Sequence, residues 1–460
     1  MSMDPVEEIL ASAGFESKAR PEIRGSDPVL PIPYRVGAAG AAALGALGLA
    51  VARIWELRGG RAQTPSVDVR AAVASLRSAR YLRINGEAPK VWDPMSGIYP
   101  VKDGWVSIHC NFPNHRDAAL KVLKAEVDRA KAEKQSSSWT GLELEDAIHA
   151  AGGCAVYVRT EADWAKHPQA QAVATEPLVG IARIGDAPPE PLTKASRPLS
   201  GVRVLDLTRV LAGPTCARSL AEHGADVLKI SAEHLPDSGL VDLDTGMGKL
   251  SAFLNLQNKN EIEKLKDLVR DADIFSQSYR PGALAARGFS PEALAKLRPG
   301  IVCVSLSAWG GSGPWRQRRG FDTIVQCASG MAQRMAKDGK PRYLPVSAID
   351  YTTGYLMAFG AAVALARRAL EGGSWLVSVS LARVGKFIVD QGLVPESAWR
   401  GAPEDLPDAE LASLLGEMDA PAGRIRHLRP VLSLPETPPR WSRPPVELGA
   451  HPAEWPPREE

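Results

Sequence analysis

Strands and helices alternate over residues 199–390, and this alternation constrains the fold more than any other feature of the chain. We expect strands at residues 202–207, 226–230, 274–277 and 301–306, with helices at 212–222, 262–271 and 291–297 between them. Strands separated by helices form βαβ units on a parallel sheet. In such a sheet the ligand lies outside the carboxyl ends of the strands. The sequence therefore predicts an α/β domain whose site is formed by the loops at 208–214, 278–282 and 307–314.

The remaining sequence divides around this domain. A Pro-rich linker at 186–198, D-A-P-P-E-P-L-T-K-A-S-R-P, is the clearest boundary. Residues 85–185 are predicted to form a small α+β domain, because 97–112 alternate apolar and polar residues about a Lys-Asp-Gly turn, as a β-hairpin does. Residues 1–84 contain a linker unit and a helix, and the segment 391–460 is a Pro-rich extension that we expect to wrap over another surface.

An internal repeat links the two halves of the chain. Residues 28–37 read P-V-L-P-I-P-Y-R-V-G, and residues 345–354 read P-V-S-A-I-D-Y-T-T-G. An Ala-rich helix, a Gly-Gly pair and a strand of V-x-V type follow both copies. The first copy has Pro33 at the position where the second has Asp350, so only the second copy can use a carboxylate.

Composition excludes several classes of function. Lys and Arg number 55 against 53 Asp and Glu, so the net charge of +2 predicts neither a nucleic-acid partner nor a membrane partner. The 5 cysteines have no C-x-x-C spacing, which argues against a metal site and fits a reducing, cytoplasmic location. The apolar run 36–51 is shorter than the ~20 residues that span a bilayer, so we expect a buried helix there. The N-terminus is acidic and lacks the order of a signal peptide.

Asp350 stands between an apolar segment and a small-residue helix. Carboxylates are rarely buried unless they are paired or used in function. Its local sequence also fits a helix N-cap, in which Asp accepts hydrogen bonds from the first free amides. Local sequence alone favours the cap.

Several stretches, taken together and in order, resemble the class III coenzyme A transferases, a family that includes formyl-CoA and carnitine-CoA transferases and the α-methylacyl-CoA racemases. The stretches include L-S-G-V-R-V-L-D-L-T-R-V-L-A-G-P from residue 199, S-Y-R-P-G-A-L from 278, S-A-W-G-G-S-G-P from 307 and the segment around Asp350. Residues 97–180 resemble the small domain of that family. The resemblance implies a Rossmann-like large domain with a smaller α+β domain, here in a rearranged or fused chain.

The resemblance also implies a mechanism. An aspartate at the position of Asp350 is the nucleophile that attacks an acyl-CoA thioester, and CoA then passes through an aspartyl-CoA thioester to a carboxylic acid. A helix N-terminus just after Asp350 would supply amides for the developing oxyanion. The resemblance implies that the CoA-binding residues are Val210, Leu211, Ala212, Lys249, Arg280 and Ala283. CoA thioesters are expected as substrates, with no tightly bound cofactor and no metal.

Three alternatives differ in testable features. A racemase needs a histidine where Phe321 stands, and phenylalanine accepts no proton. A non-enzymatic CoA-binding subunit is favoured by lost features, such as the acid expected where Ser231 follows the second strand. An NAD enzyme lacks support because no G-x-G-x-x-G follows the first strand. Asp322 is expected to bond loop amides. The family forms interlocked dimers, so the resemblance implies a homodimer, and the sequence leaves the oligomeric state open.

Overall fold

The computed structural model describes residues 3–88 and 92–458, so the outermost residues of the predicted segments 1–84 and 391–460 lie outside it. Its centre is a seven-stranded sheet with the order β10-β9-β8-β11-β12-β13-β7. All neighbours are parallel except β7, which is antiparallel to β13. The strands are β7(Gly180–Gly185), β8(Arg203–Leu207), β9(Asp226–Ser231), β10(Lys249–Phe253), β11(Ile274–Gln277), β12(Val302–Ser307) and β13(Ser374–Ser380). The α/β prediction is confirmed. Strand order reverses between β8 and β11, which marks the place where open sheets bind ligands.

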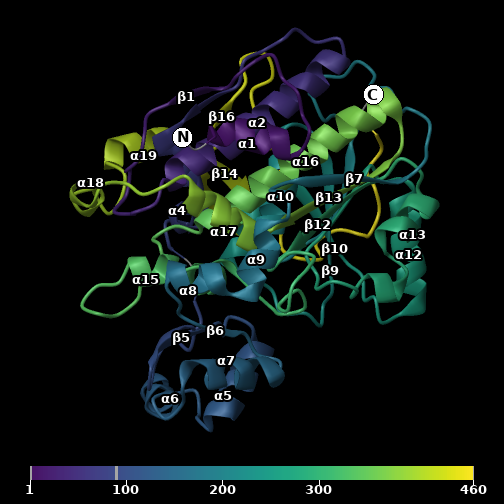
Figure 1. Cartoon of the computed structure of the whole chain (residues 1–460). Helices are drawn as coiled ribbons and strands as arrows, with labels where there is room; N and C mark the ends of the chain where they lie inside the picture. The colour runs from purple at the N-terminus through teal and green to yellow at the C-terminus, as the bar shows by residue number, and fades with distance from the viewer. Residues whose placement is uncertain (1–2, 89–91, 459–460) are drawn as a thin grey trace.

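Helices cover both faces of this sheet (Figure 1). On one face lie α10(Ala212–Glu222) and the long α16(Ala348–Glu371), whose apolar residues join those of α2(Val36–Leu57) in one core. On the other face lie α12(Lys259–Arg270) and α13(Pro291–Leu297), which pack on alternate residues of the same strands. Both α2 and α16 are long and apolar enough to cross a membrane, but 89% and 100% of their apolar windows are buried inside the protein, as in core helices.

The sequence repeat is also a structural repeat. In the first copy α2 leads through β2(Ser66–Asp68) into α3(Val69–Ser75), and in the second α16 leads through β13 into α17(Leu381–Asp390). The strand β2 pairs in parallel with β1(Glu22–Arg24) and antiparallel with β16(Leu432–Ser433), just as β13 pairs with β12 and β7. The two copies of the repeat also form hydrogen bonds with each other at their ends. Ser347 donates to the Leu76 carbonyl at 2.9 Å, and Val394 donates to the Pro33 carbonyl at 2.8 Å.

The small domain is the lower lobe of Figure 1. The hairpin β4(Gly97–Val101) and β5(Gly104–Ile108) extends to β6(Ala155–Tyr157) in an antiparallel sheet. Its helices are α5(Pro113–Leu123), α6(Arg129–Ser136) and α7(Gly141–Ala150). The predicted domain range 85–185 needs one correction, because β7 belongs to the large sheet through its hydrogen bonds with β13. The helices α8(Glu161–Lys166) and α9(Pro168–Ala174) lead to it.

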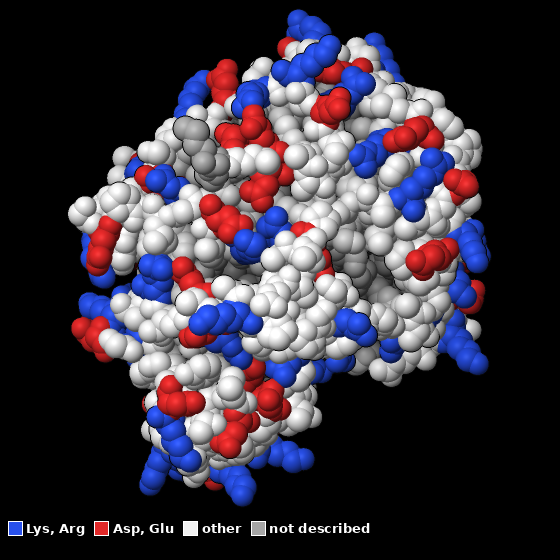
Figure 2. Space-filling view, viewed as in Figure 1, with Lys and Arg blue, Asp and Glu red and all other residues white. Residues whose placement is uncertain are grey.

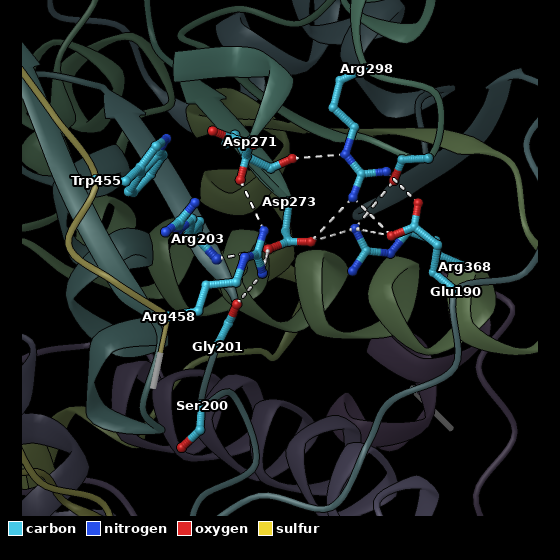
Figure 3. Close-up of polar contacts among 12 residues, drawn as sticks. Glu190, Ser200, Gly201, Arg203, Asp271, Asp273, Arg298, Arg368, Trp455 and Arg458 are labelled. Carbon is cyan, nitrogen blue, oxygen red and sulfur yellow. Dashed lines mark hydrogen bonds and ion pairs between the residues drawn. The ribbon is translucent and has the colours of Figure 1, made fainter. Parts of the chain in front are cut away.

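The C-terminal segment runs along the large sheet. Backbone bonds join His451 to the edge strand β10, where His451 donates to the Ser251 carbonyl at 2.8 Å. Figure 3 shows its end, where Arg458 bonds the Gly201 carbonyl at 2.6 Å and lies 3.4 Å from Asp273. Asp273 also pairs with Arg368 at 2.9 Å, and Glu190 of the predicted linker pairs with Arg298 in the same cluster. The amino ends of β8 and β11 are thereby tied to the linker, to α16 and to the tail.

The remaining elements lie outside these layers. They are α1(Pro5–Ser12), α4(Ser78–Tyr81), β3(Arg83–Ile84), α11(Leu240–Thr245), a short 3₁₀ turn at Ala285–Arg287, α14(Asp322–Ala328), α15(Met331–Arg334), α18(Glu396–Arg400), α19(Asp408–Leu414), β14(Leu415–Ala420) and β15(Gly423–Leu428). The last two form a hairpin that pairs with β3. On the face shown in Figure 2 basic and acidic side chains are interspersed, as the near-zero net charge implies.

Candidate active site

Asp350 lies in the first turn of α16, which begins at Ala348 after Ser347 as N-cap. The cap interpretation is therefore wrong, and so is the expectation that a helix begins just after Asp350. Asp350 is only 7% exposed. Within residues 3–88 and 92–458 no hydrogen-bond donor reaches its carboxylate. A buried carboxylate without a donor is costly, so its presence points to a use.

Asp322, the first residue of α14, faces Asp350. Its Oδ2 accepts the backbone N–H of Asp350 at 2.9 Å and a second bond from the amide of Ile349. The side chain of Gln326 donates to Oδ1, and its Oε1 accepts the amide of Leu344 at 2.8 Å. The expected role of Asp322 in bonding backbone amides agrees with these contacts. Because Asp322 takes the free amides at the start of α16, those amides are not available to an oxyanion.

The pKa of each carboxyl group is raised above its ordinary value. Burial is the larger cause for both, and the negative charge of Asp322 adds to it at Asp350, whose pKa lies well above its ordinary value. Two close carboxyls in a buried site cannot both ionise easily. Once Asp350 loses its proton, its carboxylate is therefore poorly solvated.

The loop between β8 and α10 lies beside the start of α16. Val210 has φ of 69°, which is an outlier for a β-branched residue. Leu211 is the N-cap of α10, and Leu211 and Ala212 are 7% and 3% exposed. A Cβ on Gly354, one turn after Asp350, would lie 2.6 Å from the Ala212 carbonyl oxygen. Gly354 therefore lets α10 approach α16 closely.

Lys249 takes no part in phosphate binding in this geometry, which corrects the sequence prediction. Its side chain is 1% exposed, and its Nζ lies 2.8 Å from Asp206 Oδ2 and 2.8 Å from the Pro214 carbonyl oxygen. Burial lowers the pKa of Lys249 to about 8. Burial would raise the pKa of Asp206, but the neighbouring Lys249 and Lys229 outweigh it and hold that pKa low. Lys249 instead fixes both ends of the 208–214 loop, since Asp206 also accepts the amide of Thr208 at 3.0 Å.

Arg280 and Ala283 lie in the loop that follows β11. Arg280 is exposed, and no acidic side chain of the described residues forms an ion pair with it. Ala283 is half-buried and donates its amide to the Arg280 carbonyl at 3.0 Å, which makes a turn. The loop is joined to the β8–α10 loop by a bond from the Arg209 amide to Ser278 Oγ at 3.1 Å. The two loops at the strand-order reversal thus form one unit.

An aromatic wall, formed by His109, Phe112 and His115 of the small domain with Phe321 of the large one, lies where the two domains meet. The rings of His109 and Phe321 are stacked with centroids 3.8 Å apart, and Phe112 and His115 pack around them. The guanidinium of Arg209 lies 5.1 Å from the Phe112 ring centroid. Because Phe321 precedes Asp322, this wall is joined through the chain to the carboxyl pair.

The histidines in the wall are neutral. Burial, with a smaller effect of His115, lowers the pKa of His109 to about 3. Burial and then Arg319, Arg209 and Arg280 lower the pKa of His115 to about 4. These three cations all lie close enough to His115 to act on it. Their charge favours an anionic ligand at the mouth of the site.

The sequence did not identify this wall. His109, Phe112 and His115 follow the predicted hairpin in the stretch H-C-N-F-P-N-H, and two histidines just beyond a strand were the available indication. Their contact with Phe321 joins residues more than two hundred positions apart, which local patterns do not reveal. The described residues contain no group of three or more His, Cys, Asp or Glu side chains that could hold a metal ion.

Comparison with known proteins finds relatives for the part of the chain that contains this geometry. Residues 199–413 match the profile of CoA-transferase family III. The chain is 33% identical over 219 residues to an acetyl-coenzyme A transferase of Hypoxylon pulicicidum, covering 46% of this chain and 37% of that protein. It is 27% identical over 254 residues to a probable fatty acyl-CoA transferase of Mycobacterium tuberculosis, covering 51% of this chain and 64% of that protein. It is 33% identical over 181 residues to the succinyl-CoA:glutarate CoA-transferase of Mus musculus, covering 36% and 41%.

A crystal structure of a Mycobacterium tuberculosis protein is also similar, with 30% identity and a TM-score of 0.39 over 41% of this chain and 56% of that one. The chain thus spans between 37% and 64% of the length of the three curated relatives. The matched segment contains Asp350, Asp322 and the loops after β8 and β11. The likeness of this chain to CoA-transferase family III therefore rests on residues 199–413, a little under half of its length.

Proposed function

We propose that this protein transfers CoA between an acyl-CoA thioester and a carboxylic acid through an aspartyl-CoA thioester at Asp350. The buried Asp350 carboxylate carries the proposal, because no donor among the described residues reaches it and because it lies in the first turn of α16, beside the loop that follows β8 at the strand-order reversal. A carboxylate that few donors stabilise is a better nucleophile than one that is hydrogen-bonded.

The proposed reaction has four steps. An oxygen of Asp350 attacks the thioester carbonyl, the C–S bond breaks, and CoA thiolate leaves a mixed anhydride. The thiolate attacks the aspartyl carbonyl and expels the first carboxylate, which leaves aspartyl-CoA. The acceptor carboxylate attacks this thioester, and the released thiolate then attacks the acceptor carbonyl, which frees Asp350. The anhydrides hydrolyse readily, so the wall of His109, Phe112 and Phe321 supports the reaction by excluding water.

Other groups would stabilise the charge that develops. The amides at the start of α16 are occupied by Asp322, so the start of α10 at Ala212 is the better candidate for the oxyanion. Arg209, Arg280 and Arg319 are candidates for the CoA phosphates, because guanidinium groups bind phosphate oxygens in pairs. We propose that backbone groups of Val210, Leu211 and Ala212 contact the pantetheine.

Trapping of the intermediate tests the proposal. The full-length protein is incubated with a panel of acyl-CoA thioesters, quenched with hydroxylamine or borohydride, and digested for mass spectrometry. We expect a modified peptide that contains Asp350, and no modified peptide in Asp350→Asn. Glu371→Gln, an exposed acid at the other end of α16, is the matched control and should retain the modification.

Two other outcomes would replace the proposal. Measurable CoA binding without any adduct would favour the non-enzymatic CoA-binding protein. Inversion of a 2-methylacyl-CoA would favour the racemase, although His109, the histidine beside Phe321, has a pKa of about 3 and is a weak base. The homodimer that the family resemblance implies is a separate proposal, which light scattering of the purified chain tests.

A further inference from the structure

A cavity with a volume of about 410 Å³ lies at the carboxyl ends of β11, β12 and β13. Leu376, Ser378 and Ser380 of β13 line it. The alternate residue Val377 points the other way, because a Cβ on Gly360 of α16 would lie 2.5 Å from its Cγ1. The deep part of the cavity therefore lies on the face of the sheet opposite α16.

The lining changes from apolar to polar along the strands. The deep part, under α13, is formed by Phe275, Phe289 and Leu294. Toward the strand ends Gln277 donates to Ser305 Oγ at 2.6 Å, and further hydroxyl groups follow on neighbouring strands. A cavity of this volume that is mostly apolar with a few polar groups has the properties of small-molecule sites.

The mouth carries one unpaired positive charge. Arg280 lines the cavity, and the described residues give it no acidic partner. The acid in the lining, Glu176, is already compensated, because its Oε1 accepts the Gly311 amide at 2.9 Å, the Ser312 amide at 3.1 Å and the Ser312 hydroxyl at 2.9 Å. The cavity therefore has an apolar interior and a positively charged entrance.

We propose that this cavity binds an amphipathic carboxylate, with its aliphatic chain against Phe275, Phe289 and Leu294 and its anionic head at Arg280. The deep part of this site lies on the face of the sheet opposite α16. The proposal goes beyond CoA transfer and does not depend on catalysis. An aliphatic chain joined to an anionic group comes from two sources, a free fatty acid with its carboxylate or an acyl-CoA with its phosphates.

Displacement of a fluorescent fatty acid measures the site directly. We use 11-(dansylamino)undecanoic acid with the full-length Asp350→Asn protein, so that no turnover occurs, and displace it with dodecanoate. Ser378→Trp fills the cavity from an exposed position of β13 and should weaken binding of the probe at least about tenfold. Leu370→Trp places the same side chain on an exposed residue that does not line the cavity, and should leave binding unchanged.

The head group has its own test. Arg280→Gln should weaken dodecanoate about tenfold and leave methyl dodecanoate unchanged, because only the acid forms a charge-assisted bond. Dodecanoyl-CoA, compared with dodecanoate on the Ser378→Trp protein, identifies the source of the chain: the ligand that loses affinity is the occupant.

The proposal is overturned if neither ligand displaces the probe, if Ser378→Trp binds the probe as tightly as the parent, or if the ester binds as tightly as the acid. Because Arg280 serves both proposals, Ser378→Trp is the variant that separates them: it should weaken binding of the probe, while adduct formation at Asp350, measured in the protein that keeps Asp350, should persist. The two proposals are thus tested independently.

Discussion

At the scale of single residues, the carboxyl pair of Asp322 and Asp350 sets the stability of the fold against the proposed reaction. The protonated form of Asp350 suits the fold, and the ionised form is the one that can react. Burial favours the protonated form of Asp350 in the folded protein, while the unfolded chain ionises it at an ordinary pKa. The stability that this pKa difference contributes is therefore full when the pH is below the pKa of Asp350 in the unfolded chain. It is lost as the pH rises from that pKa toward the higher pKa in the folded protein. The proposed nucleophile thus weakens the fold under the conditions in which it can react.

Asp350→Asn should accordingly stabilise the protein at pH 8, by roughly 0.5–2 kcal/mol, and much less at pH 4. Urea unfolding at both pH values measures the difference. Glu371→Gln, on the same helix but exposed, should show no such pH dependence. A loss of stability at pH 8 in Asp350→Asn would contradict the argument.

Asp322→Asn should shift the pH dependence of adduct formation. Asn keeps an oxygen that can accept the Asp350 amide but removes the negative charge that raises the Asp350 pKa. The nucleophile then ionises at lower pH, so the acidic limb of the rate profile should move down by about one pH unit or more. An unmoved limb with a normal circular dichroism spectrum would show that the charge of Asp322 does not act on Asp350.

At the scale of elements, the loop between β8 and α10 depends on a buried ion pair beneath it. Lys249 on β10 bonds Asp206 at the end of β8 and the Pro214 carbonyl in the first turn of α10. Three elements thus meet at one ammonium group. The unusual backbone of Val210 persists because both sides of the loop are held in this way.

Lys249→Met should therefore cost about 3–5 kcal/mol of unfolding free energy, because it leaves Asp206 buried without its partner. Lys264→Met is the surface control. Lys264 lies 3.5 Å from Glu454 with both side chains well exposed, so its loss should cost under about 1 kcal/mol. Equal effects in the two variants, measured by urea unfolding, would refute a supporting role for Lys249.

The elements themselves were largely predictable, and their joint geometry was not. The helices α10 and α13 and the strand β11 begin and end where their apolar patterns and caps predict. Between residues 113 and 136 the chain forms two helices, α5 and α6, because Lys124 adopts φ of 50° and ends the first. β10 was missed because Lys249 looks like a surface cation in sequence. Asp350 was found through the repeat and the family resemblance, whereas its partner wall depends on contacts between distant segments.

At the scale of the whole molecule, the C-terminal segment protects the open edge of the large sheet. β10 has a neighbour on one side only, and on the other side Gly449 and His451 bond Ser251 at 3.1 and 2.8 Å. An unprotected edge strand pairs readily with other chains. Trp455 fixes the segment further along, where its Nε1 donates to the Leu268 carbonyl at 3.0 Å.

Removal of residues 431–460 should therefore cause aggregation, which dynamic light scattering would detect. Removal of residues 452–460 alone should keep the bonds to Ser251 and give a monodisperse but less stable protein. If both truncated proteins stay monodisperse at the same concentration, the edge-protection argument fails.

The packing of α2 against α16 within one chain has a consequence for how the sequence can change. In an assembly of two identical chains, every substitution appears twice, so the two halves must accept the same residue. Here the equivalent positions are encoded separately, and one gene can hold Pro33 in one half and Asp350 in the other. Each half is free to specialise, one toward support and one toward chemistry, without a compromise between the two tasks.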